Sequence, residues 1–172
     1  MGQTGSKRGA LEVGFDGNKR VKGRKRHIIV DVLGLVVGCF VTAANVADIK
    51  AAPVVWLWAL ERFSCIEKIL ADKGYRSKAR AEQLRSAYGC ELEISLRHEQ
   101  GFEAEPKRWI VERTLAWLDN ARSLCRDYEG LPENHEGMVY VVMIRLMLRR
   151  LCQNRRTRSL TKHQKRRLGM LN

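Results

Sequence analysis

The stretch HIIVDVLGLVVGCFVT, residues 27–42, decides the fold class. β-Branched and apolar residues fill 27–31 and 35–42 with little polar alternation, as in strands that are covered on both faces. Gly34 lies in the short connection between the two runs and is typical of a turn. Because only antiparallel strands can be joined by so short a connection, we expect a β-hairpin.

A helix and a third strand are expected after this hairpin. Apolar residues at helical spacing predict a helix that ends near residue 63 and that Asn45 or Asp48 could cap. The apolar run over 66–71 predicts a strand, and Asp72 follows it directly. Ligands of α/β proteins usually bind at such strand ends, so Asp72 is a candidate site residue.

The remaining elements continue this alternation. Ser77 is placed to cap a helix over 78–88, and Gly89 to end it. Alternating residues over 90–96 predict a fourth strand. The last two predicted helices cover about 107–124 and about 134–151. This order of elements predicts an α/β fold in which helices flank a mixed sheet.

The charge of the chain is concentrated at its two ends. The net charge is +13, of which residues 1–26 carry +6 and residues 149–172 carry +9, while the middle carries −2. Basic ends suggest a polyanionic partner, although blocks of like charge are also typical of solvated tails. The composition therefore predicts a basic N-terminal arm over 1–26, irregular over its first 18 residues, a core over 27–151 and a basic tail over 152–172.

Composition also excludes several classes of protein. No two of the five cysteines form a Cys-x-x-Cys pair, which argues against zinc or a disulfide framework and favours a reducing cytoplasm. The longest apolar run, over 139–148, is interrupted by Arg145 and is shorter than the ~20 residues that span a membrane. No secretion signal is expected at the N-terminus.

Two acidic residues with basic neighbours carry the candidate chemistry. Asp72 lies in ADKGYR, residues 71–76, and Glu112 lies in PKRWIVERT, residues 106–114. Carboxylate oxygens are the ligands that Mg²⁺ prefers, and Arg108, four residues before Glu112, could orient that carboxylate or bind a phosphate. The alternatives are that Asp72 is a turn residue and that Arg108 and Glu112 form a surface salt bridge.

Several motifs in this order resemble a known family. The chain is similar to DDE-type insertion-sequence transposases with an RNase H-like core, in the branch called insertion sequence family five. The resemblance covers about residues 7–151. The motifs that carry it are KGRKRH (22–27), VDVLGL (30–35), AANVAD (43–48), ADKGY (71–75), RWIVERTLAWL (108–118), RDYEGL (126–131) and MIRLMLRR (143–150).

The resemblance implies roles for the acidic residues. Asp72 matches the second catalytic aspartate of the family, Glu112 matches its glutamate, and Arg108 matches the arginine before that glutamate. These residues would act with Mg²⁺ or Mn²⁺. The family's first aspartate lies on a strand upstream of the basic run, so we expect this chain to be the C-terminal part of a transposase whose first strand is missing.

Other positions bear on that resemblance. Asp16 and Asp31 match non-catalytic positions of the family. Asn120 and Ser123 stand where the family usually carries arginines, although Arg122 remains nearby.

The function expected from the resemblance is DNA transposition. A complete enzyme would hydrolyse a phosphodiester at a transposon end and join the freed 3′-hydroxyl to target DNA. The alternatives are a catalytically inactive DNA-binding remnant, a regulator of a full-length transposase, and a basic RNA-binding protein of ribosomal type. Expected partners are transposon ends, target DNA, and a second copy or a chain that supplies the N-terminal part. The expected location is the nucleoid in the bacterial cytoplasm.

Basic residues near the motifs and at both ends are the candidates for contact with nucleic acid. Trp109, next to Arg108, could stack on a base, although a tryptophan at helical spacing is more often a core residue. The candidate basic residues are Lys19, Arg20, Lys22, Arg24, Lys25, Arg26, Lys73, Arg76, Lys107, Arg113, Arg155, Arg156, Arg158, Lys165, Arg166 and Arg167.

Overall fold

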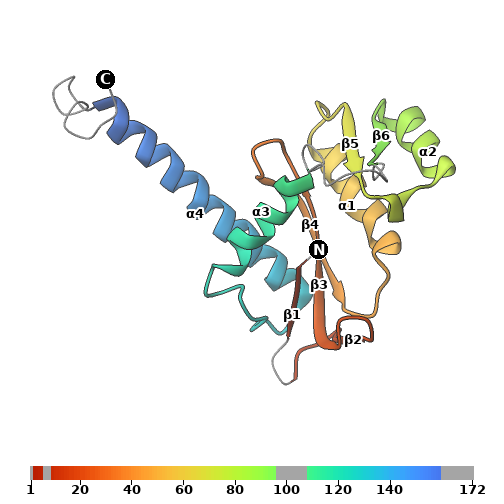
Figure 1. Cartoon of the computed structure of the whole chain (residues 1–172), viewed down its shortest axis with the longest axis horizontal. Helices are drawn as coiled ribbons and strands as arrows, with labels where there is room; N and C mark the ends of the chain where they lie inside the picture. Colours follow the sequence, from red (N-terminus) through yellow and green to blue (C-terminus); the bar gives the residue numbers. More distant parts are fainter. Residues whose placement is uncertain (1, 6–8, 96–107, 160–172) are drawn as a thin grey trace, which may run out of the picture.

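A computed structural model describes residues 2–5, 9–95 and 108–159 of the chain (Figure 1). Strands and helices alternate after an N-terminal group of strands. The described elements are β1 (Gly2–Gly5), β2 (Gly14–Asp16), β3 (Val21–Val30), β4 (Val36–Ala43), α1 (Asp48–Arg62), β5 (Lys68–Ala71), the 3₁₀ turn η1 (Lys73–Tyr75), α2 (Lys78–Tyr88), β6 (Glu91–Ile94), α3 (Arg108–Asp119) and α4 (Pro132–Ser159).

Strand β3 is the centre of a four-stranded antiparallel sheet. Gly23 pairs with Gly5 of β1 on one edge and with Gly14 of β2 on the other. Arg24, the next residue, pairs with Ala43 of β4, so β2 and β4 follow one another along the same edge. The predicted hairpin is therefore confirmed as the β3–β4 pair.

The other two strands form a separate parallel pair. Residues of β5 pair in register with those of β6, from Lys68 opposite Glu91 to Ala71 opposite Ile94. The Lys68 ammonium bridges the carboxylates of Glu91 and Glu93 on the neighbouring strand at 3.2 and 2.9 Å. The predicted α/β class is confirmed, but in the described part of the chain the strands form two sheets rather than one mixed sheet.

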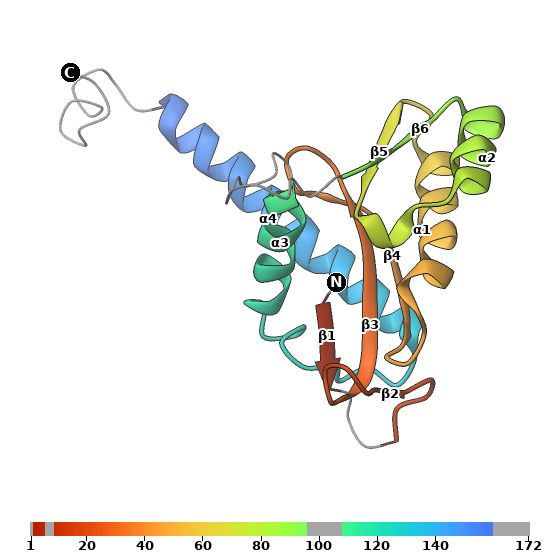
Figure 2. The ribbon, with the colours of Figure 1, turned by 45° about the vertical axis from the view of Figure 1, so that its right-hand side comes forward.

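Helices cover the two sides of the β3–β4 hairpin, with α1 on one side and α4 on the other (Figure 2). Side chains of β4 alternate between them, as expected for a strand. Cys39 and Val41 are buried in a cluster with Val139 and Met143 of α4. Phe40 instead meets Trp58 of α1 edge to face, with 5.4 Å between the ring centroids.

A second core cluster lies beneath α1 and links it to the parallel strands. Its fully or almost fully buried members are Ala52, Trp56, Leu60, Ile69, Leu84 and Cys90. This cluster fixes β5, and with it the backbone that leads to Asp72.

The prediction that the first 18 residues are irregular is wrong for β1 and β2. Both edges of β3 expose backbone N–H and C=O groups that need partners, and β1 and β2 supply them. Residues 21–26 belong to β3 itself. The predicted boundary between an arm and a core at residue 26 therefore falls inside a strand.

The helix ends agree with the sequence prediction where they depend on a capping residue next to the helix. The Ser77 hydroxyl accepts from the backbone N–H of Arg80, and Gly89 ends α2 with φ +63°, so both predicted caps are confirmed. Neither Asn45 nor Asp48 caps α1: Ala47 occupies that position, and no side chain caps it.

The last two helices differ from the predicted spans. Helix α3 ends at Asp119, earlier than predicted, and α4 runs from Pro132 to Ser159, beyond the predicted end. No helix among the described residues is long and apolar enough to cross a membrane.

Candidate active site

Asp72 is exposed at the carboxyl end of β5, where the strand gives way to η1. Its backbone is extended, with φ −73° and ψ 163°, and its Oδ1 accepts a hydrogen bond from the N–H of Lys73 at 2.7 Å. This bond leaves Oδ2 and further lone pairs available to a ligand on the solvent side. The sequence prediction that Asp72 directly follows a strand is confirmed.

Tyr75 lies close to this carboxylate. Burial, together with the negative charges of Asp48 and Asp72, raises the pKa of the Tyr75 phenol to about 12. Because the phenol stays protonated at neutral pH, the surroundings of Asp72 gain a hydrogen-bond donor and no extra charge.

Glu112 is exposed on the first half of α3. Arg108 opens the same helix four residues earlier, which places both residues on one face. Residues 96–107, which include Lys107, lie outside the described residues. Asp72 therefore follows a strand of the parallel pair β5–β6, whereas Glu112 belongs to helix α3.

The turn of the β3–β4 hairpin holds α3 in place. The Thr114 hydroxyl lies 2.8 Å from the carbonyl oxygen of Gly34 and 3.0 Å from that of Ile110. Arg113 Nη2 donates to the carbonyl oxygen of Leu33 at 3.0 Å. These contacts come from the two residues that follow Glu112, so they fix the part of the helix that carries the carboxylate.

An alternating stack of aromatic and guanidinium groups runs from α3 to α4. The Arg113 guanidinium lies 4.2 Å from the ring centroid of Trp109 and 4.7 Å from that of Trp117. Arg150 of α4 stacks on Trp117 at 4.5 Å. Cation–π contacts of this kind stabilise the helix pair. The guanidinium of Arg113, a predicted nucleic-acid contact, is therefore already engaged within the protein.

Asp72 and Glu112 are the type of ligand that a hard metal ion prefers, but they are only two residues. Asp72 and Glu112 offer carboxylate oxygens, which Mg²⁺ prefers. Within residues 2–5, 9–95 and 108–159, His, Cys, Asp and Glu side chains form no group of three or more that could hold a metal.

Comparisons with known proteins identify the family. The family model described as Transposase DDE domain matches residues 2–147. The chain belongs to the DDE transposase family.

A curated relative agrees with this assignment. The protein named "Putative transposase for insertion sequence element IS402" from Burkholderia cepacia is 33% identical over 121 residues, which cover 66% of this chain and 57% of the relative. The chain thus matches little more than half the length of that relative. No solved structure matches the chain significantly.

Two basic residues predicted to contact nucleic acid are buried in this DDE domain, and that prediction is wrong for them. The side chains of Arg24 and Arg26 are 0% exposed. Arg24 pairs with the buried Asp127 at 3.0 Å and also donates to the carbonyl oxygens of Leu11, Glu129 and Gly130. A side chain enclosed in this way cannot reach a phosphate.

Arg26 is enclosed in a similar way. It pairs with Asp119, the last residue of α3, at 2.5 Å. Arg26 therefore connects β3 to the helix that carries Glu112. Lys25, between the two arginines, is largely buried and bridges Asp16 at 3.2 Å and Asp48 at 3.5 Å.

The remaining basic candidates of the transposase fall into three groups. Lys19, Arg20, Lys22, Lys73 and Arg76 are exposed. Arg155, Arg156 and Arg158 lie on the last turns of α4. Lys107, Lys165, Arg166 and Arg167 lie outside the described residues.

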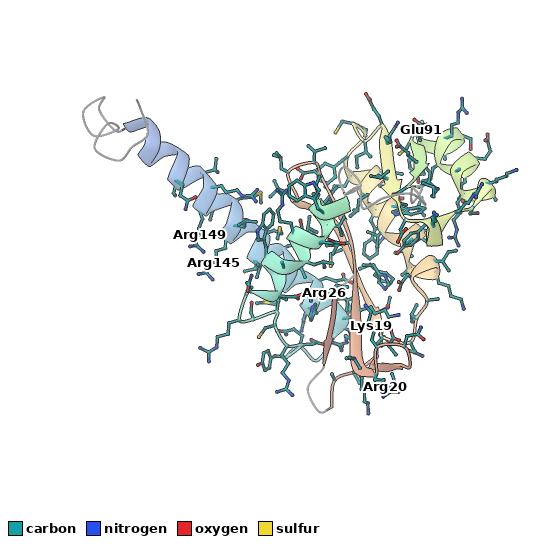
Figure 3. All side chains as sticks on the ribbon, in the orientation of Figure 1. Lys19, Arg20, Arg26, Glu91, Arg145 and Arg149 are labelled. Atoms are coloured by element: carbon teal, nitrogen blue, oxygen red, sulfur yellow. The ribbon has the colours of Figure 1, made fainter. Side chains whose placement is uncertain are left out.

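A basic hollow was missed by sequence reasoning. Its volume is about 590 Å³, and it is lined by Ala121, Arg122, Ser123, Tyr128 and Arg145. Among the described residues, neither arginine has an ion-pair partner and no acidic side chain lines the hollow. The available signal was Arg145, a charge inside an otherwise apolar helical run. Lys19 and Arg20 lie at the far end of the sheet from Arg145 (Figure 3).

Proposed function

We propose that this DDE domain acts in DNA transposition, with Asp72 and Glu112 as metal-binding carboxylates and Arg108 as a phosphate-binding or orienting residue. The observation that carries the proposal is the exposure of Asp72 at the carboxyl end of β5, within a chain that belongs to the DDE family. The reaction class is phosphodiester hydrolysis followed by strand transfer.

Each residue has a defined task in this proposal. The Lys73 N–H holds one oxygen of Asp72, so the other is oriented toward solvent and ligand. Thr114 and Arg113 hold α3 against the hairpin turn, and this contact limits the movement of Glu112. Bound Mg²⁺ would neutralise charge on the phosphate and activate the attacking oxygen.

DNA is the proposed substrate and partner. Arg122 and Arg145 converge on one hollow with the hydroxyl groups of Ser123 and Tyr128, and all four groups can donate hydrogen bonds to phosphate oxygens. A second basic surface is offered by the exposed residues Lys19 and Arg20, which lie far from Arg145 in Figure 3, and by the exposed Lys22 at the start of β3.

A second candidate is DNA binding without cleavage, as a remnant or as a regulator of a full-length transposase. It is favoured by the lack of a three-ligand group among the described residues. We expect the isolated chain to bind duplex DNA with little sequence preference and to cut it slowly or not at all. Mg²⁺-dependent nicking of a supercoiled plasmid that disappears in Asp72→Ala would establish the chain as an enzyme and reject this second candidate.

The metal sites can be tested without cleavage. Free Mn²⁺ is measured by electron paramagnetic resonance during titration with the chain. Asp72→Asn and Glu112→Gln are each expected to weaken Mn²⁺ binding by about tenfold or more, because each removes a carboxylate ligand. The control, Glu67→Gln with Glu82→Gln, removes two exposed carboxylates elsewhere and should leave binding unchanged. Equal binding in all variants would reject the assignment of Asp72 and Glu112.

The DNA-binding surface is tested by its salt dependence. Arg122→Gln with Arg145→Gln should reduce the slope of log Kd against log salt for a fluorescent duplex by about 2, since each phosphate contact contributes about 0.9. Lys78→Gln with Arg85→Gln removes the same charge from exposed positions on α2 and should change the slope far less. Equal changes of the slope in the two double variants would show that DNA binding depends on net charge and not on the hollow of Arg122 and Arg145.

A further inference from the structure

Helix α4 carries apolar residues on two opposite faces. Val139 and Met143 are buried in the core. Val141, Ile144, Leu148 and Leu151, which we call the α4 stripe, are exposed by 55, 51, 56 and 61%. At 3.6 residues per turn, the four side chains fall within a sector of roughly 80°, on the far side of the helix from the core. A helix that is apolar on both faces is expected to be covered on both.

The C-terminal end of α4, beyond Arg150 and its contact with Trp117 of α3, extends away from the other described elements (Figures 1 and 2). The described elements leave each residue of the α4 stripe more than half exposed. The residues are spaced three, four and three apart, which is the spacing of a coiled-coil seam. This spacing indicates that the missing cover is another helix.

The residues beside the stripe suit a parallel helix of the same sequence. In a parallel pair, Met147 of one copy would face Cys152 of the other. Arg145 would lie opposite residue 140, a tyrosine whose hydroxyl accepts from the Cys39 N–H of its own chain at 3.1 Å. No like charges oppose one another at these flanking positions. The stripe lies opposite the core face of α4, so the two folded bodies would be held on opposite sides of the pair.

We propose that the α4 stripe pairs in parallel with the same stripe of a second copy of this chain. Four aliphatic side chains from each copy bury less than the roughly 1,200 Å² of a stable interface, so the dimer is weak, with a dissociation constant on the order of 10–100 μM. Each copy carries a net charge of +13, and this charge opposes association. Because salt screens repulsion between like charges, the dimer strengthens as salt rises, which is opposite to the salt dependence of DNA binding.

Sedimentation equilibrium of the full chain tests this proposal. At about 100 μM protein, the average mass should rise from near 19.8 kDa at low salt toward twice that value at high salt. Ile144→Gln with Leu148→Gln should remain monomeric at both salt concentrations. The control, Val32→Gln with Leu33→Gln, removes two apolar side chains of the hairpin turn that are more exposed than Ile144 and Leu148, and it should still dimerise. A monomer under all conditions, or equal loss in both pairs, would overturn the proposal.

Disulfide trapping tests the parallel orientation. Leu151→Cys is made in a chain in which the exposed Cys65, Cys125 and Cys152 are replaced by serine. Oxidation with copper–phenanthroline should yield a covalent dimer, because residue 151 meets itself in a parallel pair. In an antiparallel pair it would lie opposite residue 141, which places the two introduced thiols about 15 Å apart along the helices. Absence of the covalent dimer would reject the parallel arrangement.

Discussion

Thr114 of α3 lies with its hydroxyl oxygen 2.8 Å from the carbonyl oxygen of Gly34 in the hairpin turn. Gly34 has φ +81°, and a Cβ at this position would lie 2.8 Å from the Thr114 hydroxyl and 3.0 Å from the Trp117 ring. Helix α3 can approach the turn only because residue 34 has no side chain. The turn therefore sets the position of the helix that presents Glu112.

Gly34→Ala is expected to destabilise the fold by about 2 kcal/mol or more, because it combines a positive φ with an overlap against α3. Urea denaturation followed by circular dichroism measures the change. Gly137→Ala is the matched control: nothing lies within 4 Å of its added Cβ, and it replaces glycine inside a helix. The control should be neutral or stabilise the protein by up to about 1 kcal/mol. Similar destabilisation in both variants would contradict the role of the turn.

Asp127→Asn is expected to destabilise the protein by about 3–5 kcal/mol, because it leaves the buried Arg24 guanidinium without a counter-charge. The same substitution weakens the contact between Asp127 Oδ1 and His135 Nδ1, which are 2.9 Å apart. The measurement is the free energy of unfolding in urea. Glu82→Gln, on the exposed face of α2, serves as the control and should change it by less than about 0.5 kcal/mol. If Asp127→Asn lowers the free energy of unfolding by less than about 1 kcal/mol, groups other than Asp127 stabilise the buried Arg24 charge.

The lowered pKa of His27 predicts that the folded protein loses stability in acid. Burial lowers the pKa of His27 from 6.5 to about 4, so the folded protein holds this imidazole neutral. The unfolded chain takes up the proton first, so the stabilisation is complete above pH 6.5 and is lost as the pH falls toward 4. His27→Gln removes this dependence, and the wild type should lose about 1–3 kcal/mol relative to the variant between pH 7 and pH 4.

The comparison with His27→Gln also removes the contribution of other groups. Burial raises the pKa of Glu136, which acts in the opposite direction in the acid range. Both proteins contain Glu136, so its contribution cancels in the difference. Parallel stability curves for the two proteins would show that His27 does not titrate as expected.

The five cysteine thiols should react with Ellman's reagent at two different rates. Cys65, Cys125 and Cys152 are exposed, whereas Cys39 and Cys90 are buried. Burial raises the pKa of Cys90, and it raises that of Cys39 to about 12, so neither forms a reactive thiolate in the folded state. Reaction with Ellman's reagent should release three equivalents quickly and two more only after unfolding in guanidinium chloride. Five fast equivalents would contradict the burial of Cys39 and Cys90.

Local signals in the sequence predicted local structure well. The hairpin, the Ser77 and Gly89 caps and the strand that ends at Asp72 all depend on neighbouring residues, and all are confirmed. Arg24 and Arg26 in the basic run over 19–26 were misinterpreted because burial depends on distant partners. Arg26 pairs with a residue 93 positions away, and no pattern within the run distinguishes it from an exposed arginine.

The candidate site was predictable in part for a similar reason. The positions of Asp72 and Glu112 followed from a strand end and from a helical motif. The hollow formed by Arg122 and Arg145 requires the segment between α3 and α4 to fold against α4, and this depends on packing and not on sequence spacing.

The ion pair between Arg24 and Asp127 also bears on how the chain folds during synthesis. The two residues are 103 positions apart, so the ribosome makes Arg24 roughly 5–20 s before Asp127. Until then the β3–β4 hairpin can form, but one of its central side chains lacks the carboxylate that neutralises it within the core. The N-terminal sheet is therefore expected to remain open on the nascent chain and to close only when the segment after α3 arrives.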